Sequence, residues 1–407
     1  MVQEPRLTNG DRGRRFDYID TLRGYAILGV IGVHSSELFP SLEWPLRLIA
    51  DQGARGVQLF FTVSALTLMM SWQSRADGVL PFWTRRVFRI GPMFWLALAY
   101  YLIVVGWLHV GLRYWGPTEI SWRSALTSAA LVLGFHPDTM NGIVPGGWSI
   151  ADEMEFYALF PLLVLIIRSW RAAAVALIAS TALVLALSAS IIRILPALLQ
   201  TPSPGFLANF GELFPFQLPA FLVGILVFYL LRTFSGRLSC NVLRTALLCA
   251  LAFIAAFPFL SAFFAGRMHW SIYSLLFGLP PISYSIVFGV VAFCLAEGVG
   301  RPLVNAVVSH IGRVSYSAYF WHFAMLELIG LAVASLGWSL ADLGWPAYLA
   351  TFILAVALSV AGATLTFLLI EQPMIRIGHR LAQASAKRKA MASNRPAIVS
   401  SAGELMP

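Results

Sequence analysis

Long stretches of apolar residues, separated by short polar segments, follow one another along nearly the whole chain. A helix needs about 20 such residues to cross the roughly 30 Å hydrocarbon core of a bilayer. Another stretch, 123–135, is short and leads into the Gly- and Pro-containing sequence HPDTMNGIVPGGW. The pattern predicts an all-α membrane protein with about ten transmembrane helices plus one short re-entrant or interfacial helix. The predicted spans are 18–39, 53–72, 90–110, 148–168, 172–194, 213–231, 243–265, 277–297, 312–333 and 346–370.

The composition supports lipid as the main solvent of this chain. Of its 407 residues, 58% are hydrophobic and only 12% are charged, whereas charged residues make up about a quarter of an ordinary globular domain. The first 16 residues, MVQEPRLTNGDRGRRF, lack the apolar core of a secretory signal. We therefore expect the first long stretch to remain in the protein as an anchor.

The basic residues predict how the helices alternate across the membrane. With the N-terminus inside and ten crossings, most of the 28 Lys and Arg residues fall in inner segments, as the positive-inside rule requires. The net charge of +9 does not indicate nucleic-acid binding, because the basic residues are scattered among short loops. The predicted organisation is a cytoplasmic tail at 1–16, a transmembrane domain at 17–379 and a disordered basic cytoplasmic tail at 380–407.

The first predicted span carries ionisable residues that are costly to place in hydrocarbon. Each charge costs at least about 2.5 kcal/mol there, so such residues usually face a polar cavity. The eleven positions from Arg23 to His34 correspond to about 16 Å of rise and about 20° of rotation, so both side chains point the same way. Asp20 joins this face and forms an inner ion pair with Arg23 in the predicted arrangement. A structural interpretation stays open, in which Arg23 reaches the inner surface and His34 satisfies a neighbouring helix.

Three arginines follow the second predicted span, in the sequence FWTRRVFRIGP. Arg86 and Arg89 share a helical face, with Arg85 beside them. The planar guanidinium group donates two parallel hydrogen bonds and therefore suits phosphate. An ordinary positive-inside loop explains the same charges.

Several carboxylates open the predicted span at 148–168, in the sequence GGWSIADEMEFYALFP. Ser149 can cap this helix, and one acid near the N-terminus interacts favourably with the helix dipole. That role requires one acid, whereas this segment contains three, namely Asp152, Glu153 and Glu155. Because Glu153 and His34 are predicted at comparable depth, a carboxylate-oriented imidazole can act there as a general base towards a hydroxyl.

Two further polar features lie near the end of the hydrophobic region. In IGRVSYSAYFWHFAMLEL, Ser315, Tyr319 and His322 form a polar stripe on an otherwise apolar helix. Glu371 precedes Pro373, where a helix stop with an interfacial acid is the simplest structural interpretation. A lone histidine on such a stripe is also commonly structural.

Taken together and in this order, these segments resemble the integral-membrane acyltransferase family 3, a group of bacterial membrane O-acyltransferases. The chain departs from the family pattern at Ser64-Ala65, where Ser-Gly is usual, and at Gln58, where an acid is common. The motifs that carry the resemblance are Asp20-x-x-Arg23-Gly24 followed by His34; GARGVQLFFTVSA at 53–65; Arg86-x-x-Arg89-Ile90-x-Pro92; Trp148-Ser149-Ile150-x-x-Glu153-x-x-Phe156-Tyr157; Ser315-Tyr316-Ser317 leading to Trp321-His322; and Glu371-x-Pro373.

The resemblance implies transfer of an acyl group, commonly acetyl, from cytoplasmic acyl-CoA to a hydroxyl of a sugar or other acceptor. It also implies a bacterial cytoplasmic (inner) membrane location, no metal, and no permanently bound cofactor. Our hypothesis makes His34 the general base, oriented by Glu153 and assisted by Arg23, with Arg85, Arg86, Arg89 and Arg23 binding acyl-CoA. Direct transfer and an acyl-enzyme intermediate both stay open, as does the oligomeric state. The other polar candidates are Asp20, Trp148, Ser149, Tyr157, Ser315, Tyr319, His322 and Glu371.

A transporter or flippase of a lipid-linked or anionic substrate is the main alternative. Intramembrane charges and broken helices also line transport pathways, and LPPIS at 279–283 suits a broken helix. Against this alternative, the two halves of the chain show no paired interruption. A membrane scaffold without catalytic activity is less favoured, because it gives no reason for Arg23 and His34 to share one face.

Overall fold

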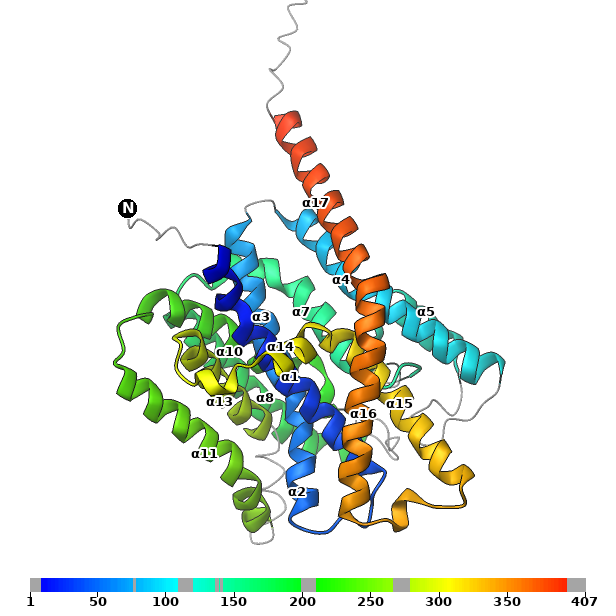
Figure 1. Cartoon of the computed structure of the whole chain (residues 1–407). Coiled ribbons are helices and arrows are strands. Elements are labelled where there is room, and N and C mark those ends of the chain that lie inside the picture. Colours follow the sequence, from blue (N-terminus) through cyan, green and yellow to red (C-terminus); the bar gives the residue numbers. More distant parts are fainter. Residues whose placement is uncertain are drawn as a thin grey trace, which may run out of the picture.

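The computed structural model describes residues 9–75, 78–108, 120–135, 139, 142–198, 210–265 and 279–393, and these residues form helices and turns without strands (Figure 1). This agrees with the predicted all-α fold. The α-helices are α1 (Asn9–Glu37), α2 (Leu46–Asp51), α3 (Gly56–Ser74), α4 (Val79–Tyr101), α5 (Trp122–Ala129), α7 (Gly147–Ile166), α8 (Trp170–Leu198), α10 (Phe214–Phe234), α11 (Cys240–Ala265), α13 (Leu279–Ala296), α14 (Ala306–Arg313), α15 (Ser315–Ser335), α16 (Trp345–Thr366) and α17 (Gln372–Ser393).

Within the described residues, seven helical segments are long and apolar enough to cross a membrane. The chain is therefore an integral membrane protein. Each of the ten predicted spans coincides with a helix, but α1 and α7 carry the charged residues discussed above, and the apolar part of α13 is short. The count of ten crossings thus stays a prediction. The seven segments are Leu46–Ser74, Val79–Trp107, Trp170–Ser190, Phe214–Phe234, Cys240–Phe263, Ser315–Ser335 and Trp345–Arg388.

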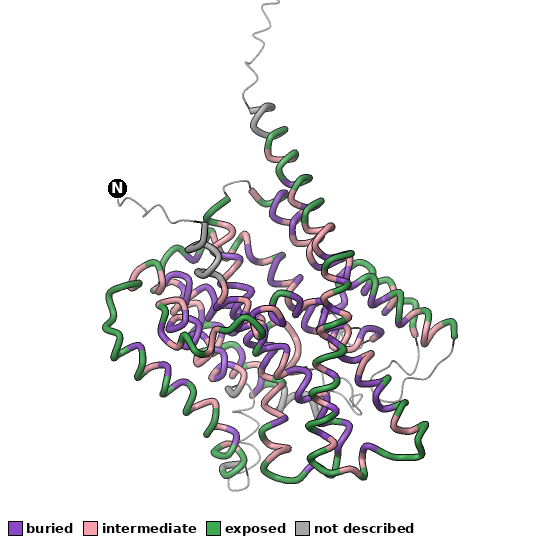
Figure 2. The backbone as a smooth tube through the Cα atoms, in the orientation of Figure 1, coloured by how far each residue is buried: buried purple, intermediate pink, exposed green. Residues whose placement is uncertain are grey.

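The centre of the bundle is built around α1, which packs against α3, α14, α15 and α16, and around α10, which packs against α3, α8 and α13. The tube in Figure 2 is mostly buried in this central region and mostly exposed along α11, whereas α17 carries exposed, intermediate and buried positions. Small residues let the backbones approach closely. A Cβ atom on Gly53 would strike the carbonyl oxygen of Gly29, and one on Gly312 would strike that of Asp20. These contacts fix the position of α1, which carries Arg23 and His34.

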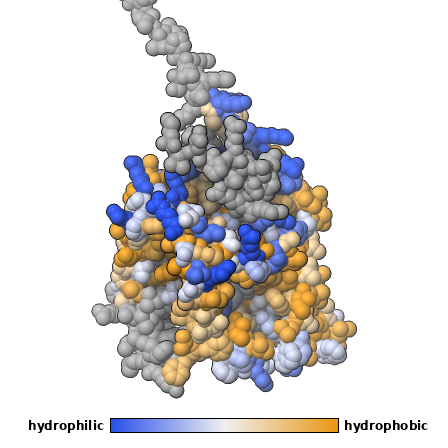
Figure 3. Space-filling model, turned by 60° about the vertical axis from the view of Figure 1, so that its left-hand side comes forward, coloured by the Kyte–Doolittle hydropathy of each residue, from blue (hydrophilic) through white to orange (hydrophobic). Residues whose placement is uncertain are grey.

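Apolar side chains also cover much of the outer surface, as the space-filling view in Figure 3 shows. Outward-facing residues of α11 and α16 include Leu248, Leu260, Ile353 and Leu365, which are 66%, 51%, 64% and 58% exposed. A soluble protein rarely exposes such continuous apolar surface. These side chains are the ones that would face lipid.

Polar contacts bring together the helix ends that the predicted alternation assigns to the same side. On the predicted inner side, Arg232 near the end of α10 donates a 2.6 Å hydrogen bond to Gln73 near the end of α3. On the predicted outer side, Ser41 after α1 donates a 2.6 Å hydrogen bond to the carbonyl oxygen of Ala341, before α16. The start of α1 and the end of α17 lie at the same end of the molecule (Figure 1).

The predicted disorder from residue 380 is wrong as far as Ser393. The chain passes from α16 through a turn of π-helix at Phe367–Glu371 into α17 without a stop, so Glu371 does not end a helix. Packing against α4 orders this segment: Gly378 meets the ring of Phe88, and Ala382 is 0% exposed. Residues 394–407 lie outside the described residues. At the other end, α1 begins at Asn9, within the predicted tail, and residues 1–8 are not described.

The short predicted helix at 123–135 is α5, which is eight residues long and too short to span a bilayer. Ser121 caps it by accepting a 3.0 Å hydrogen bond from the amide of Ser124. Trp122 and Leu126 are 77% and 62% exposed. A helix of this length with exposed apolar residues agrees with the interfacial prediction.

Candidate active site

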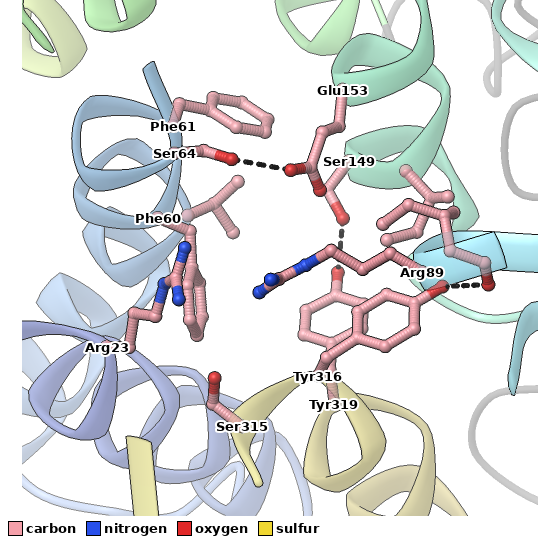
Figure 4. Close-up of a pocket in the computed structure, with 13 residues that line it drawn as sticks. Arg23, Phe60, Phe61, Ser64, Arg89, Ser149, Glu153, Ser315, Tyr316 and Tyr319 are labelled. Atoms are coloured by element: carbon pink, nitrogen blue, oxygen red, sulfur yellow. Dashed lines mark hydrogen bonds between the residues drawn. The ribbon is translucent and has the colours of Figure 1, made fainter. Parts of the chain in front are cut away.

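A pocket of about 600 Å³ lies between α1, α3, α4, α7 and α15. It therefore joins segments that are far apart in the sequence, as the close-up in Figure 4 shows. Apolar side chains from α3, including Phe60 and Phe61, form one wall. The polar lining comprises Arg23, Ser64, Arg89, Ser149, Glu153 and Ser315, together with the hydroxyl-bearing side chains of Tyr316 and Tyr319.

Two guanidinium groups point towards each other across this pocket, Arg23 from α1 and Arg89 from α4 (Figure 4). Arg23 donates a long, 3.4 Å hydrogen bond to Thr67. Within the described residues, neither arginine has an ion-pair partner within 4.0 Å. The expected ion pair between Asp20 and Arg23 is accordingly not formed at this distance. Glu153 lines the same pocket, and two guanidinium groups that face one pocket form an attractive site for a further anion.

Glu153 also lies at the pocket, but its partners differ from the predicted one. Its Oε1 atom accepts a 2.6 Å hydrogen bond from Ser64 of α3 and another from the hydroxyl of Tyr157. The expected contact with His34 is not formed: His34 Nδ1 lies 3.2 Å from Glu37 Oε2, one turn further along α1. The carboxylate beside the imidazole is therefore that of Glu37, whereas Glu153 binds Ser64 of α3.

The three arginines of α4 are divided between the pocket and the packing behind it. Arg89 lines the pocket. The guanidinium carbon of Arg86 instead lies 5.8 Å and 5.7 Å from the ring centres of Phe82 and Tyr157, in cation–π geometry. Arg85 is buried, with 7% exposure. Arg86 thus supports Tyr157, which in turn donates to Glu153.

A compact set of hydroxyl groups lies where α7 begins. The hydroxyl oxygens of Ser149 and Tyr319 are 3.0 Å apart, and each lies 3.0 Å from the carbonyl oxygen of Gly146. Gly146 has φ = 71°, a left-handed conformation that favours glycine. The sequence allows Ser149 to cap the helix, but the structure places Gly146 at the N-cap position, so this end of α7 has no side-chain cap. Ser149 is bound to α15 instead.

The remaining predicted residues surround the pocket at different distances. Ser315 lines it. Trp148 packs edge-on against Phe61, with ring centres 6.3 Å apart. Glu371 is buried and accepts a 2.8 Å hydrogen bond from Ser317, outside the pocket lining.

The two histidines lie together beside Tyr319, outside the pocket lining. The ring centres of His34 and His322 are 5.4 Å apart, and those of His322 and Tyr319 are 5.6 Å apart. His322 is 0% exposed, whereas the side chain of His34 is 24% exposed. The structure thus places His34 of the first predicted span beside His322 of the polar stripe on α15.

Comparison with known proteins decides the family. A sequence profile described as an acyltransferase domain, that of acyltransferase family 3, matches residues 16–364. This chain belongs to acyltransferase family 3. The match covers all the pocket-lining residues, and Glu371 lies just beyond it. The protein is an integral-membrane acyltransferase, which confirms the resemblance and the enzyme class predicted from the motifs.

Two relatives of this acyltransferase extend over most of its length. Acyltransferase MdmB of Streptomyces mycarofaciens is 27% identical over 410 residues, which span 91% of this chain and 95% of MdmB. Exopolysaccharide production protein ExoZ of Rhizobium meliloti (strain 1021) is 25% identical over 331 residues, spanning 80% of this chain and 90% of ExoZ. Nodulation protein 10 of Rhizobium leguminosarum bv. viciae is 30% identical over 141 residues, spanning 32% and 38%. No solved structure matches the chain significantly.

Asp152 of this acyltransferase is a second polar feature of α7. Its side chain is 0% exposed, and within the described part of the chain neither carboxylate oxygen has a hydrogen-bond partner. Glu155 and Glu212 are its charged neighbours. A buried polar group without partners destabilises the folded state.

We therefore expect Asp152→Leu to stabilise the fold. An apolar side chain of similar size removes an unsatisfied group, whose desolvation costs about 1–3 kcal/mol. The expected result is a higher melting temperature in detergent, measured by the temperature dependence of intrinsic fluorescence. A lower melting temperature would show that Asp152 has a stabilising partner after all.

Proposed function

We propose that this enzyme transfers an acyl group, in the simplest case acetyl, from cytoplasmic acyl-CoA to a hydroxyl of a sugar. The acceptor would belong to a cell-envelope glycan or a glycosylated metabolite. One observation carries the proposal: two arginines without ion-pair partners among the described residues face one pocket inside the helical bundle. The name of ExoZ links that relative to exopolysaccharide production, which supports a glycan acceptor.

The pocket suits the donor because coenzyme A is anionic. Its phosphates would be bound by Arg89, which faces the pocket from α4, since guanidinium groups bind phosphate through paired hydrogen bonds. The flexible pantetheine arm would carry the thioester past Arg23. The arm would extend beyond Arg23 along α1, so that the acyl carbon reaches the hydroxyl beside His34.

The acceptor would approach from the opposite end of α1. His34 lies about 16 Å further along the helix than Arg23, and both it and Glu37 are partly exposed, at 24% and 39%. Glu37 would hold the imidazole so that its free nitrogen takes the proton of the attacking hydroxyl. The new C–O bond forms as the C–S bond breaks, and the proton ends on the sulfur of CoA.

The membrane arrangement completes the proposal. The inner mouth would be the end of the molecule where α1 starts and α17 ends (Figure 1), with both termini in the cytoplasm. The bacterial cytoplasmic membrane is the corresponding location, because acyl-CoA is then available at the arginine end. The basic residues of the inner segments support this orientation.

The test is acyl transfer by the purified protein in liposomes. Labelled acetyl-CoA is added on the side where protease reaches the C-terminal tail, together with a lipid-linked oligosaccharide. We expect free CoA to appear only when acceptor is present, and mass spectrometry to find an ester that mild base removes. Acceptor-independent CoA release, or movement of unmodified oligosaccharide across the bilayer, would contradict the proposal.

A further inference from the structure

The predicted inner end of the molecule gathers positive charge on two helices that pack together. α17 contacts α4, and the two lie side by side in Figure 1. The sequence of α4 contains three arginines, that of α17 contains five Lys and Arg residues, and neither contains an acid. Like charges on packed helices repel one another, and such a cost is expected where the charges serve to bind an anion.

A glycine brings one histidine of α17 close to the arginines of α4. Gly378 lies directly against Phe88, since a Cβ atom on this glycine would strike the Phe88 side chain. Phe88 stands between Arg86 and Arg89 in the sequence, and His379 follows Gly378. The helix contact therefore places His379 beside the basic segment of α4.

The charged neighbours of His379 come from two helices. They include Arg75, directly after α3, and Arg85, Arg86 and Arg89 of α4. Arg85 is buried and Arg86 packs on aromatic rings, whereas Arg75 is exposed and His379 is partly exposed. Arg75 and His379 are thus open to a ligand, and the arginines behind them add to the positive potential there.

Arg89 connects this surface with the candidate active site. It is a charged neighbour of His379 and also lines the pocket, where the proposed function has it bind phosphate. Coenzyme A carries a further phosphate on the 3′ oxygen of its ribose, at the end of the molecule opposite the thiol. Because the pantetheine arm would run from Arg89 past Arg23, the nucleotide end would extend the other way, towards His379.

We propose that Arg75 and His379 bind the 3′-phosphate of acyl-CoA at the inner mouth, so that α17 forms part of the donor site. The inference rests on the proposed function, in which acyl-CoA is the donor. A guanidinium group and a protonated imidazole both donate charge-assisted hydrogen bonds to phosphate oxygens. The site would select CoA over donors that lack this phosphate. α17 lies beyond the part of the chain that the family profile matches.

The headgroup of an anionic lipid carries the same phosphate chemistry, and basic segments beside a membrane attract it. The exposed Arg376 and Arg380 are the residues of α17 that suit such a headgroup. Each is two positions from Gly378, about 200° around the helix, so both point away from α4. His379 instead neighbours Arg89 of the pocket, which favours the donor as its ligand.

The test measures equilibrium binding of CoA and of dephospho-CoA, which lacks only the 3′-phosphate, to the full-length protein. Nanodiscs of neutral phosphatidylcholine keep anionic lipid from competing. We expect the wild type to bind CoA about 10- to 100-fold more tightly than dephospho-CoA, as hydrogen bonds between charged groups predict. Arg75→Ala combined with His379→Ala should bind the two equally. Its affinity for dephospho-CoA should match that of the wild type, which also shows that the variant is folded.

Arg376→Ala combined with Arg380→Ala is the matched control, because it removes two charges from the outer face of the same helix. It should keep the preference for CoA. The inference is wrong if the wild type binds both compounds equally, if the Arg75 and His379 double variant keeps the preference, or if the control loses it. A wild type that transfers acetyl groups but binds both compounds equally contradicts this inference alone. A wild type that binds neither compound and transfers nothing contradicts the proposed function.

Discussion

The His34→Ala variant is expected to transfer acyl groups about 10²- to 10⁴-fold more slowly than the wild type, the range that a positioned general base contributes. In the wild type, the Nδ1 atom of His34 lies 3.2 Å from Glu37 Oε2, which leaves Nε2 to accept the hydroxyl proton. The measurement is the rate of acceptor-dependent CoA release at saturating acyl-CoA. Binding of CoA should be unchanged, because His34 does not line the pocket.

Glu37→Gln provides a graded control for this prediction. The amide keeps a hydrogen-bond acceptor beside the imidazole but removes the negative charge that stabilises its protonated form. We expect a smaller loss of rate than for His34→Ala. The partial exposure of both side chains, 24% and 39%, predicts little change in melting temperature for either variant. A His34→Ala enzyme with wild-type rate would exclude His34 as the base.

Removing both pocket arginines should have the largest effect on donor binding. For Arg23→Ala combined with Arg89→Ala, we expect CoA affinity to fall by roughly 10- to 100-fold per arginine, since hydrogen bonds to charged groups contribute about 1.5–3 kcal/mol each. Equilibrium binding of CoA to the protein in lipid nanodiscs measures this loss. Arg89→Lys should recover only part of it, because an ammonium group lacks the planar fork of donors.

The stability of the same double variant separates a binding role from a structural one. In the unliganded protein Arg23 and Arg89 face each other without ion-pair partners among the described residues, so their removal should leave the melting temperature equal or raise it. Arg313→Ala is the matched control: Arg313 is exposed and lies 3.4 Å from Ser309, and its loss should not affect CoA binding. Unchanged CoA affinity in the double variant would place the phosphates elsewhere.

Much of the fold could be predicted because a bilayer requires each spanning helix to contain a long run of apolar residues. Every predicted span coincides with a helix, and the short segment at 123–135 was rightly separated from them. The end of the chain was harder to predict. Its Ala-, Lys- and Arg-rich composition suggests disorder, but contacts such as that between Gly378 and Phe88 order α17, and these depend on α4, about 300 positions away.

In the candidate site, too, contacts within one helix could be predicted from the sequence, whereas contacts between helices could not. The helical period places Arg23 and His34 on one face of α1, and it also places Glu37 one turn after His34. That local signal could have identified Glu37 as the partner of the imidazole. No local pattern could have shown that Ser64 binds Glu153 or that His322 lies beside His34.

By itself, the sequence determined the helical membrane architecture, the family, and the polar residues from which the site is built. These properties follow from apolar length, from residue type and from the period of a single helix. Only the tertiary structure decided that Arg23 and Arg89 face one pocket, that Glu153 binds Ser64, and that two histidines meet. The period of a helix gives the direction of each side chain about its own axis, whereas the rotation and depth of one helix against another depend on side-chain packing across the bundle.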